Sequence, residues 1–369
     1  MLRDTRDLRN KNRMQIYELL LDADTTSRTE IRNATSISSP TVLRIIDEFN
    51  DLKIIEEMPL RSTAPGRPSV GFRLVADYVY SIAVFHEGTW ILGCVMDVKG
   101  KIVYTKRIKA EISFDSVLND QIPNLIETML QQSNLDHKRI QGIALGFPAI
   151  LDPYEKIINY APLIGINEPI DISSWMLKLG EKYQTFVCIE NDVNSLAIGE
   201  HAKRGIEDSA DMAYVALGTG IGAGIILRGK LRHGKNNRAG EIGLTLTNNG
   251  KTLEEVIGTR ALFEKFPEGY SDQAEAVDFI STVLSPYLIN FAICFDMDLI
   301  VLGGYTMEMM GEKLLSAVQE KIEKISAIPV KVEAGLSAQP GLDGLGRLIR
   351  LRFLQQLRND GLQAIKQYL

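Results

Sequence analysis

A run of alternating glycines is the first feature of this chain that could take part in chemistry. Residues 213–227 read AYVALGTGIGAGIIL, so Gly218, Gly220, Gly222 and Gly224 interrupt two apolar, strand-like segments. Alternate glycines between strands predict a tight turn, and an anion can approach its backbone N–H groups because no Cβ stands in the way. The usual ligand of such a turn is a phosphate group, so the first functional question is whether this turn holds one.

The N-terminal residues form a second set suited to binding, in this case to DNA. A helix is expected at residues 8–21, and the capping box SRTE at residues 27–30 predicts a second helix that ends near Thr35. A third helix is expected to follow, with Ser39 as its N-cap residue and Pro40 as its first helical residue. Three helices of this kind, the last with a small polar tip, are typical of a helix-turn-helix that inserts this tip into the major groove.

The third helix is expected to have one buried and one exposed face. Its apolar residues repeat with helical spacing and predict a buried stripe, formed by Val42, Ile45, Ile46, Phe49 and Leu52. Two strands at 54–58 and 70–75 should follow, joined by a basic loop that forms a wing. The residues expected to contact DNA lie on the exposed face and in the wing: Ser38, Ser39, Thr41, Arg44 and Arg67. A three-helix module that binds another protein is the alternative.

Net charge restricts any DNA contact to the region near the N-terminus. The chain has 41 Lys and Arg against 47 Asp and Glu, and its net charge of −6 argues against general binding to nucleic acid or anionic membranes. Residues 1–75 are more basic, with 12 positive and 11 negative side chains. Five basic residues are expected to contact phosphates, unless they belong to a solvated, frayed end: Arg3, Arg6, Arg9, Lys11 and Arg13.

Length and composition describe an ordinary globular protein. The 369 residues, 45% hydrophobic, predict two or three domains. No signal peptide and no apolar run long enough to span a membrane are recognised. Cys94, Cys188 and Cys294 lie far apart, which fits a reducing cytoplasm and gives no zinc-site spacing.

Strand and helix patterns alternate from Tyr80 onward and predict a second domain of two α/β lobes around a ligand-binding cleft. Strands are expected at 81–85, 90–97, 101–108, 142–145, 186–190 and 299–302, and helices at 115–133, 195–203, between 252 and 295, and at about 345–369. The predicted domains are therefore residues 1–76 and 77–369.

Several separated motifs, in this order, resemble the ROK family of repressors, open reading frames and sugar kinases, which includes the xylose and N-acetylglucosamine repressors. The motifs are SSPTVLRIIDEF, GRPS, GFPAILDP, IENDVNSLAIGE, LGTGIGAGIIL, RAGEIG, TLEE and IVLGG. The resemblance implies an N-terminal winged helix-turn-helix followed by a two-lobed α/β actin/hexokinase-like (ribonuclease H-like) ROK domain. It also implies a homodimer or homotetramer with a sugar in the cleft.

The resemblance also implies which residues bind the ligand. Asn191 and Asp192 match the family's pair that hydrogen-bonds sugar hydroxyls, and Asp192 matches the general base of the kinases. Glu241 and Glu254 match two further carboxylates that contact the sugar. Charged acceptors bind hydroxyl donors strongly in a dry cleft, which suits a polyol. The alternative for each acid is a helix cap or a surface carboxylate.

The sequence departs from the kinases of the family at their phosphate turn. Their Asp-x-Gly-Gly-Thr is replaced by FHEGT at residues 85–89, with Phe85 at the aspartate position and Glu87 at the first glycine. A glutamate repels phosphate, and without the aspartate no acid there can organise magnesium. ATP binding and kinase activity are therefore not expected, and Asp192 would be catalytic only if such activity existed.

Two further departures affect metal and sugar binding. Leu244 stands where the family has a zinc-binding histidine that also touches the sugar, and residues 245–252 contain no cysteine, so no zinc is expected. Leu163 replaces an asparagine that is frequent in the family. The ligand is expected to be less hydroxylated, differently oriented or lost. His233 is interpreted as an ordinary core or surface histidine rather than a ligand.

These features together favour a cytoplasmic transcriptional regulator, most simply a repressor of carbohydrate-metabolism genes. Its partners would be double-stranded operator DNA and a small carbohydrate or sugar phosphate, without a membrane contact. Two alternatives stay open: an ATP-dependent sugar kinase with an added DNA-binding module, and a regulator without a small ligand that a partner protein controls. For a repressor, the glycine turn would be an inherited structural turn.

Overall fold

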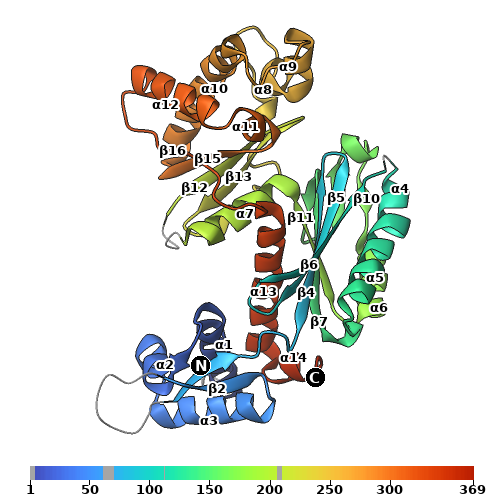
Figure 1. Cartoon of the computed structure of the whole chain (residues 1–369), viewed down its shortest axis with the longest axis vertical. Helices are drawn as coiled ribbons and strands as arrows, with labels where there is room; N and C mark the ends of the chain where they lie inside the picture. The colour runs from blue at the N-terminus through green and yellow to red at the C-terminus, as the bar shows by residue number, and fades with distance from the viewer. Residues whose placement is uncertain (1–4, 61–69, 112, 206–209) are drawn as a thin grey trace.

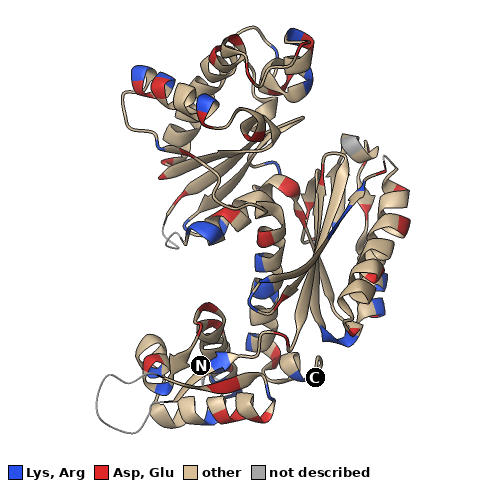
Figure 2. Cartoon of the chain, viewed as in Figure 1, with Lys and Arg blue, Asp and Glu red and all other residues tan. Residues whose placement is uncertain are grey.

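The chain consists of an N-terminal module and two lobes, joined by one long helix (Figure 1). The computed structural model describes residues 5–60, 70–111, 113–205 and 210–369. The module and the second lobe lie at opposite ends of the long axis, and helix α13 (Pro340–Asp360) runs from the junction of the lobes to the module. Acidic and basic side chains are interspersed over all three parts (Figure 2).

The N-terminal module contains three helices and a small antiparallel sheet of order β1–β3–β2. Its elements are α1 (Thr5–Asp22), β1 (Thr26–Ser27), α2 (Arg28–Thr35), α3 (Ser39–Asp51), β2 (Ile55–Pro59) and β3 (Val70–Leu74). The predicted capping box is confirmed, because Ser27 and Glu30 exchange side-chain to backbone hydrogen bonds of 3.2 and 2.7 Å. The predicted stripe is also confirmed for Val42, Ile45, Ile46 and Phe49, whereas Leu52 is partly exposed at the C-cap.

The predicted start of the third helix is wrong by one residue. Ser38, not Ser39, is the N-cap residue, and Pro40 is therefore the second helical residue. Ser38 keeps an extended backbone (φ −62°, ψ 143°), and its hydroxyl lies 2.9 Å from that of Thr41 instead of capping a backbone N–H. A proline in the first turn is tolerated because the first N–H groups of a helix have no intrahelical acceptor.

The two lobes share one strand topology. In each, a first strand pairs antiparallel with the second and parallel with the fourth, so that the order in chain sequence is 3-2-1-4-5. The first lobe has β4 (Tyr80–Glu87), β5 (Trp90–Asp97), β6 (Ile102–Lys109), β7 (Ile140–Phe147) and β11 (Phe186–Asn191), and the second has β12 (Met212–Leu217), β13 (Ile221–Leu227), β14 (Lys230–Leu231), β15 (Leu299–Gly303) and β16 (Val332–Ala334). This repeat confirms the predicted plan of two α/β lobes.

Helices cover both faces of the first sheet. One face packs against α5 (Ile122–Ser133) and α6 (Ser173–Tyr183), and the other packs against α13. The single helix expected at 115–133 is instead α4 (Phe114–Ser116), a π-helical turn (Val117–Gln121) and α5. Pro123 explains the interruption, because it has no N–H to continue the α-helical hydrogen-bond ladder.

The second lobe contains a long apolar helix. α10 (Ala274–Phe295) is long and apolar enough, by length and composition, to cross a membrane, although Glu275 and Asp278 interrupt its apolar residues. Its Ile280, Leu284 and Leu288 lie in the core of the lobe, where α12 (Glu312–Ile325) packs against it. The core helix of a globular protein can be equally long and apolar, so the place of α10 in this core explains its composition.

The last helix differs from the prediction at both ends. α13 begins at Pro340, stops at Asp360 and is followed by the short α14 (Gln363–Lys366). The break lies at Gly361, which has φ +61° and approaches α1 so closely that a Cβ would lie 2.4 Å from Asn10 Oδ1. Residues Phe353 to Tyr368 of this region share the core of the N-terminal module, so both chain ends build that core.

Candidate functional site

The corner between β11 and α7 (Asp192–Arg204) positions the first candidate ligand residues. Asn191 is the N-cap of α7: its side-chain oxygen accepts a 2.9 Å hydrogen bond from the backbone N–H of Asn194. Its Nδ2 donates to the carbonyl of Ala149 at 2.9 Å. Helix α7 thus starts three residues before the predicted position, because an asparagine N-cap begins it. The Asn191 amide, a predicted sugar contact, is already used in holding this corner together.

Asp192 follows in the first turn of α7 and has an unusual acidity. Burial raises its pKa to about 7, and the negative charges of Glu241 and Glu87 act in the same direction. The backbone N–H of Val193 donates to the carboxylate and opposes part of this rise. A carboxyl group with a pKa near neutrality can accept or donate a proton when it meets a hydroxyl group. Asp192 is therefore the most reactive carboxyl group of the candidate site.

The second lobe supplies Glu241 and Glu254. Burial raises the pKa of Glu241, and the charge of Glu254 adds to this effect. Glu254, in α8 (Leu253–Ile257), accepts a 3.2 Å hydrogen bond from the backbone N–H of Ile221, directly after the glycine turn. The structure thus brings Glu241 within electrostatic reach of both Asp192 and Glu254. Together with Asn191 and Glu87, we call them the interlobe site.

The glycine turn is held by the chain itself. The N–H of Gly218 donates to the carbonyl of Gly220 at 3.1 Å, and the N–H of Thr259 donates to the carbonyl of Gly218 at 2.9 Å. Ile221 N–H, directly after the turn, has the Glu254 carboxylate as its acceptor. A carboxylate at this position opposes the approach of a second anion.

The equivalent hairpin of the first lobe, β4–β5, presents different chemistry. The ring of Phe85 is buried against α13, where a Cβ at Gly341 would lie 2.6 Å from it. Glu87 ends β4, and burial together with the charge of Glu308 in α11 (Tyr305–Met310) raises its pKa, whereas Arg107 lowers it. This hairpin therefore directs an acid toward the second lobe where the kinases have a glycine.

Sequence reasoning missed a pair of residues that links the lobes. His233 Nε2 lies 2.8 Å from Glu190 Oε2, and the other oxygen of Glu190 accepts from Asn191 N–H and from Asn194 Nδ2. Burial lowers the pKa of His233, but the bond to Glu190 outweighs it, and the net shift is upward. The interpretation of His233 as a core or surface histidine did not include this contact with the first lobe. The available signal was Glu190 itself, an acid beside the Asn-Asp pair.

A second contact reinforces this link. Asn237 Nδ2, in the segment that leads to Glu241, donates to Asp152 Oδ2 of the first lobe at 2.7 Å. The ring of Tyr154 meets that of His233 edge-on, with centroids 5.8 Å apart. The segment between β14 and Glu241 is thus fixed to the first lobe at two points.

The two leucines that replace polar residues of the family, Leu244 at the zinc and sugar position and Leu163 at the sugar position, are only partly described. Leu244 is 57% exposed, and the side chain of Leu163 lies outside the described residues. In the described part of the chain, no three or more His, Cys, Asp or Glu side chains are grouped in a way that could hold a metal ion. That the protein works without zinc stays a prediction.

The candidate DNA-contacting residues lie at the start of α3. Ser38 and Ser39 are exposed at the N-terminal tip of the helix, Thr41 is half-buried, and Arg44 is exposed on the side opposite the buried stripe. Arg67 and Arg3 lie outside the described residues.

Two of the other basic residues expected to contact phosphates form ion pairs within the protein instead. Both Arg9 and Arg13 pair with Glu48 of α3, Arg13 at 2.9 Å, and thereby fix α1 onto α3.

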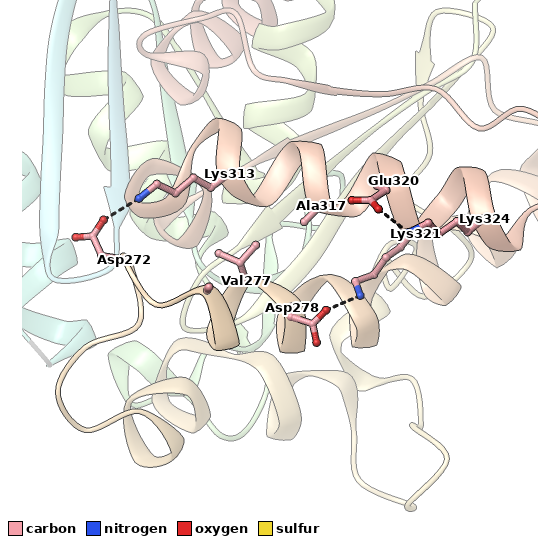
Figure 3. A pocket seen from close by; sticks show the side chains of 9 residues that line it. Asp272, Val277, Asp278, Lys313, Ala317, Glu320, Lys321 and Lys324 are labelled. Atoms are coloured by element: carbon pink, nitrogen blue, oxygen red, sulfur yellow. Dashed lines mark hydrogen bonds and ion pairs between the residues drawn. The ribbon is translucent and has the colours of Figure 1, made fainter.

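A groove on the outer helices of the second lobe is a weaker candidate (Figure 3). It has a volume of about 460 Å³ and lies between α10 and α12. Lys313 pairs with Asp272 at 3.0 Å and Lys321 with Asp278 at 2.7 Å, while Lys324 pairs with Glu320 (Figure 3). Its charges are thus paired within the groove, and none of its residues belongs to the interlobe site.

Known proteins resemble this chain in sequence and in fold. Residues 82–253 match the model of the ROK family. The xylose repressor of Bacillus subtilis is 25% identical over 256 residues, a match that covers 69% of this chain and 65% of the repressor. The match thus spans slightly less than two thirds of this relative's length.

Solved structures extend the likeness to the whole chain. A ROK family transcriptional regulator, a homologue of the Escherichia coli protein MLC, superposes with a TM-score of 0.76 over 98% of this chain and 99% of its own, at 18% identity. A ROK family glucokinase from Streptomyces griseus, solved with glucose and AMPPNP, superposes on 74% of this chain and 99% of its own with a TM-score of 0.61, at 23% identity. Residues 82–253 therefore resemble the ROK family, and the chain has the two-lobed fold of these solved structures.

Proposed function

We propose that the chain is a transcriptional repressor of carbohydrate-metabolism genes whose affinity for operator DNA changes when a sugar-like ligand binds at the interlobe site. One observation carries the proposal: a three-helix module is docked, through α13, onto a pair of lobes with a sugar-kinase fold. The similarity to a xylose repressor and to a solved ROK regulator supports it.

The N-terminal module would bind the DNA as a winged helix-turn-helix. α3 would enter the major groove with Ser38, Ser39 and Thr41 at the bases and Arg44 beside the backbone. Arg67 would reach the minor groove from the segment that joins β2 and β3. A symmetric homodimer or homotetramer in the cytoplasm would read a palindrome with half-sites one or more helical turns apart.

The ligand would be a small carbohydrate. Asp192 and Glu241 have carboxylate oxygens that can accept hydroxyl protons, and sugar hydroxyls donate such bonds. The concentration of negative charge around Asp192 favours an uncharged sugar over a sugar phosphate. The exposed Leu244 would place an apolar edge next to this ligand.

Operator selection tests the DNA-binding half of the proposal. The full chain is used to enrich duplexes from a random pool, and the affinity of the selected duplex is then measured for wild type, Arg44→Ala and Arg67→Ala. We expect each substitution to weaken binding at least ten-fold, with Lys178→Ala in the first lobe as a matched control. Wild-type binding that is the same for selected and unselected duplexes would contradict a sequence-specific regulator.

Thermal unfolding with a panel of pentoses, hexoses, amino sugars and their phosphates tests the ligand half. A ligand at a hundred times its Kd stabilises the folded state by about 2.7 kcal/mol. We expect one neutral sugar to raise Tm in wild type but not in Asp192→Asn, and to change operator affinity. A regulator controlled by a protein partner instead would give no Tm shift with any sugar.

A sugar kinase is the second candidate function, favoured by the pKa of about 7 at Asp192 and by the fold shared with a glucokinase. The buried Phe85 and the acidic Glu87 oppose it, because phosphoryl transfer depends on positioned phosphates and magnesium. ADP release in a coupled assay with the same sugars decides between them. If the wild-type chain released ADP and Asp192→Asn abolished this turnover, a kinase would be the better assignment than a repressor. We expect no turnover. Neither ATP nor zinc is part of the proposed function.

A further inference from the structure

A basic recess lies where the two ends of the chain meet. Its volume is about 620 Å³, and residues of α1, α3, α14 and the end of α13 line it. Five of its side chains are positive and one is negative: Arg6, Arg9, Arg13, Arg44, Lys366 and Asp360. The recess is therefore a concave positive surface, assembled from α1, α3 and the C-terminal segment 360–366.

Part of this positive charge is not compensated within the protein. Arg9 and Arg13 share the carboxylate of Glu48, as described above. By contrast, Arg44 and Lys366 are exposed, and neither has an ion-pair partner among the described residues. Asp360 is the one acid among the charged residues that line the recess, so its net charge is positive and attracts an anion. Phosphate groups are the anions that arginine and lysine commonly bind.

The C-terminal segment presents Lys366 from a fixed position. Ala364, Ile365 and Tyr368 are buried in the core of the N-terminal module, and the hydroxyl of Tyr368 donates to the carbonyl of Gln141 at 3.1 Å. Asn10 Nδ2 donates to the carbonyl of Asn359 at 3.3 Å, next to the close approach of Gly361. The backbone that carries Lys366 is thus anchored to both the module and the first lobe.

We propose that this recess binds a backbone phosphate of the operator, so that the C-terminus of the chain completes the DNA-binding surface. The proposal rests on the proposed function. Arg44 lies five residues beyond Ser39 on α3, or about 7.5 Å along the helix axis. With the tip of α3 at the bases, Arg44 lies beside the flanking backbone, and Lys366 binds the same strand from the opposite wall of the recess.

This arrangement also ties DNA binding to the lobes. α13 ends beside the recess and begins at α7, where the two helix backbones touch: a Cβ at Gly199 would lie 1.9 Å from the carbonyl oxygen of Pro340, and one at Gly344 equally close to that of Ser195. α7 itself starts at Asp192. A ligand that moves α7 therefore moves the helix that positions Lys366.

The test compares Lys366→Ala with Lys178→Ala in the full chain, using a duplex selected by the wild-type chain and an unselected duplex. One lost phosphate contact lowers the slope of log K against log salt concentration by about 0.9, which corresponds to about eight-fold weaker binding at 0.1 M salt. We expect this loss for Lys366→Ala on both duplexes, since a phosphate contact reads no sequence. Lys178, exposed on α6, should change neither value.

The outcomes separate the inference from the function on which it rests. If Arg44→Ala weakens binding while Lys366→Ala behaves like Lys178→Ala, the inference is wrong and the proposed function stands. If the wild-type chain selects no duplex, both are wrong. If inorganic phosphate raises Tm in wild type but not in Lys366→Ala, and DNA affinity is equal in both, the recess is a site for free phosphate instead. Lys366 is exposed, so Tm without ligand should not change in Lys366→Ala.

Discussion

The hairpins β4–β5 and β12–β13 occupy equivalent places in the two lobes, yet their turns carry opposite chemistry. The second hairpin keeps its glycines and holds its turn with internal hydrogen bonds and the Glu254 carboxylate. The first carries the aromatic ring of Phe85, the buried imidazole of His86 and the acid Glu87. The comparison shows that two sheets can share one backbone plan while their matched turns carry different side chains.

The neighbouring helix explains why the first hairpin tolerates this change. Phe85 lies in a small core with Cys94, Leu342 and Leu345, between the sheet and α13. Phe85 therefore attaches the sheet to the helix that leads to the N-terminal module, and its contacts give it a structural role.

The largest expected effect is that of restoring the kinase residue, Phe85→Asp. An aspartate at this 4% exposed position would put an unpaired charge between β4 and α13. We expect it to lower the free energy of unfolding by about 4 kcal/mol, measured by urea denaturation, whereas Phe85→Leu should cost about 1 kcal/mol. A stable Phe85→Asp variant that binds magnesium and nucleotide would show that the hairpin has kept its phosphate chemistry.

His86 gives the first hairpin a sensitivity to acid that the second lacks. Burial lowers its pKa to about 4, and neither ring nitrogen has a hydrogen-bond partner among the described residues. The unfolded imidazole takes up a proton near pH 6.5 and the folded one only near pH 4, so the unfolded state binds more protons in between. The free energy of unfolding should therefore fall by about 3 kcal/mol as the pH drops through this window.

The variant His86→Leu isolates this contribution. Other groups also change stability with pH, so the quantity to compare is the difference between wild type and variant, measured by urea denaturation at pH 7 and pH 4. We expect the variant to lose about 3 kcal/mol less than wild type over this range. Parallel curves for the two proteins would mean that His86 finds a partner or becomes hydrated in the folded state.

The second hairpin should respond more weakly when its acid is changed. Glu254→Gln keeps the size of the side chain but replaces a charged acceptor of the Ile221 N–H by a neutral one. We expect a loss of about 1 kcal/mol in the free energy of unfolding. The pKa of Glu241 should fall, because Glu254 no longer repels its charge. Carbon-13 NMR titration measures this pKa, and an unchanged value would contradict the proposed proximity of the two acids.

The sequence was sufficient for the elements that local rules determine. The Ser27 capping box, the buried stripe of α3 and the paired hairpins each follow from short-range spacing, and the order of the motifs led to the family. Asn191 shows the limit of this reasoning. Its place in the motif was recognised, but the second contact of its amide is with the carbonyl of Ala149, 42 residues away.

Several missed features depend on residues distant in the chain. His233 gains its meaning from Glu190, 43 residues earlier, and Arg13 gains its meaning from Glu48, 35 residues later. The end of α13 at Gly361 is set by contact with Asn10, at the other end of the chain. No local pattern encodes such pairings, because hydrogen bonds and close contacts across domains depend on the final packing.

The smallest expected effect sharpens the comparison at Glu87, the residue that faces the second lobe from the first hairpin. Its charge is one of those that raise the pKa of Asp192, so Glu87→Gly should lower that pKa below its value of about 7, as measured by carbon-13 NMR titration. Glu308→Gln is the matched control: Glu308 raises the pKa of Glu87 but is not among the groups that shift Asp192. An equal response to both changes would mean that the acids act through a general field rather than through Glu87. Nucleotide binding should not return in Glu87→Gly, because Phe85 still fills the metal position, so the first hairpin would have regained a glycine without regaining its chemistry.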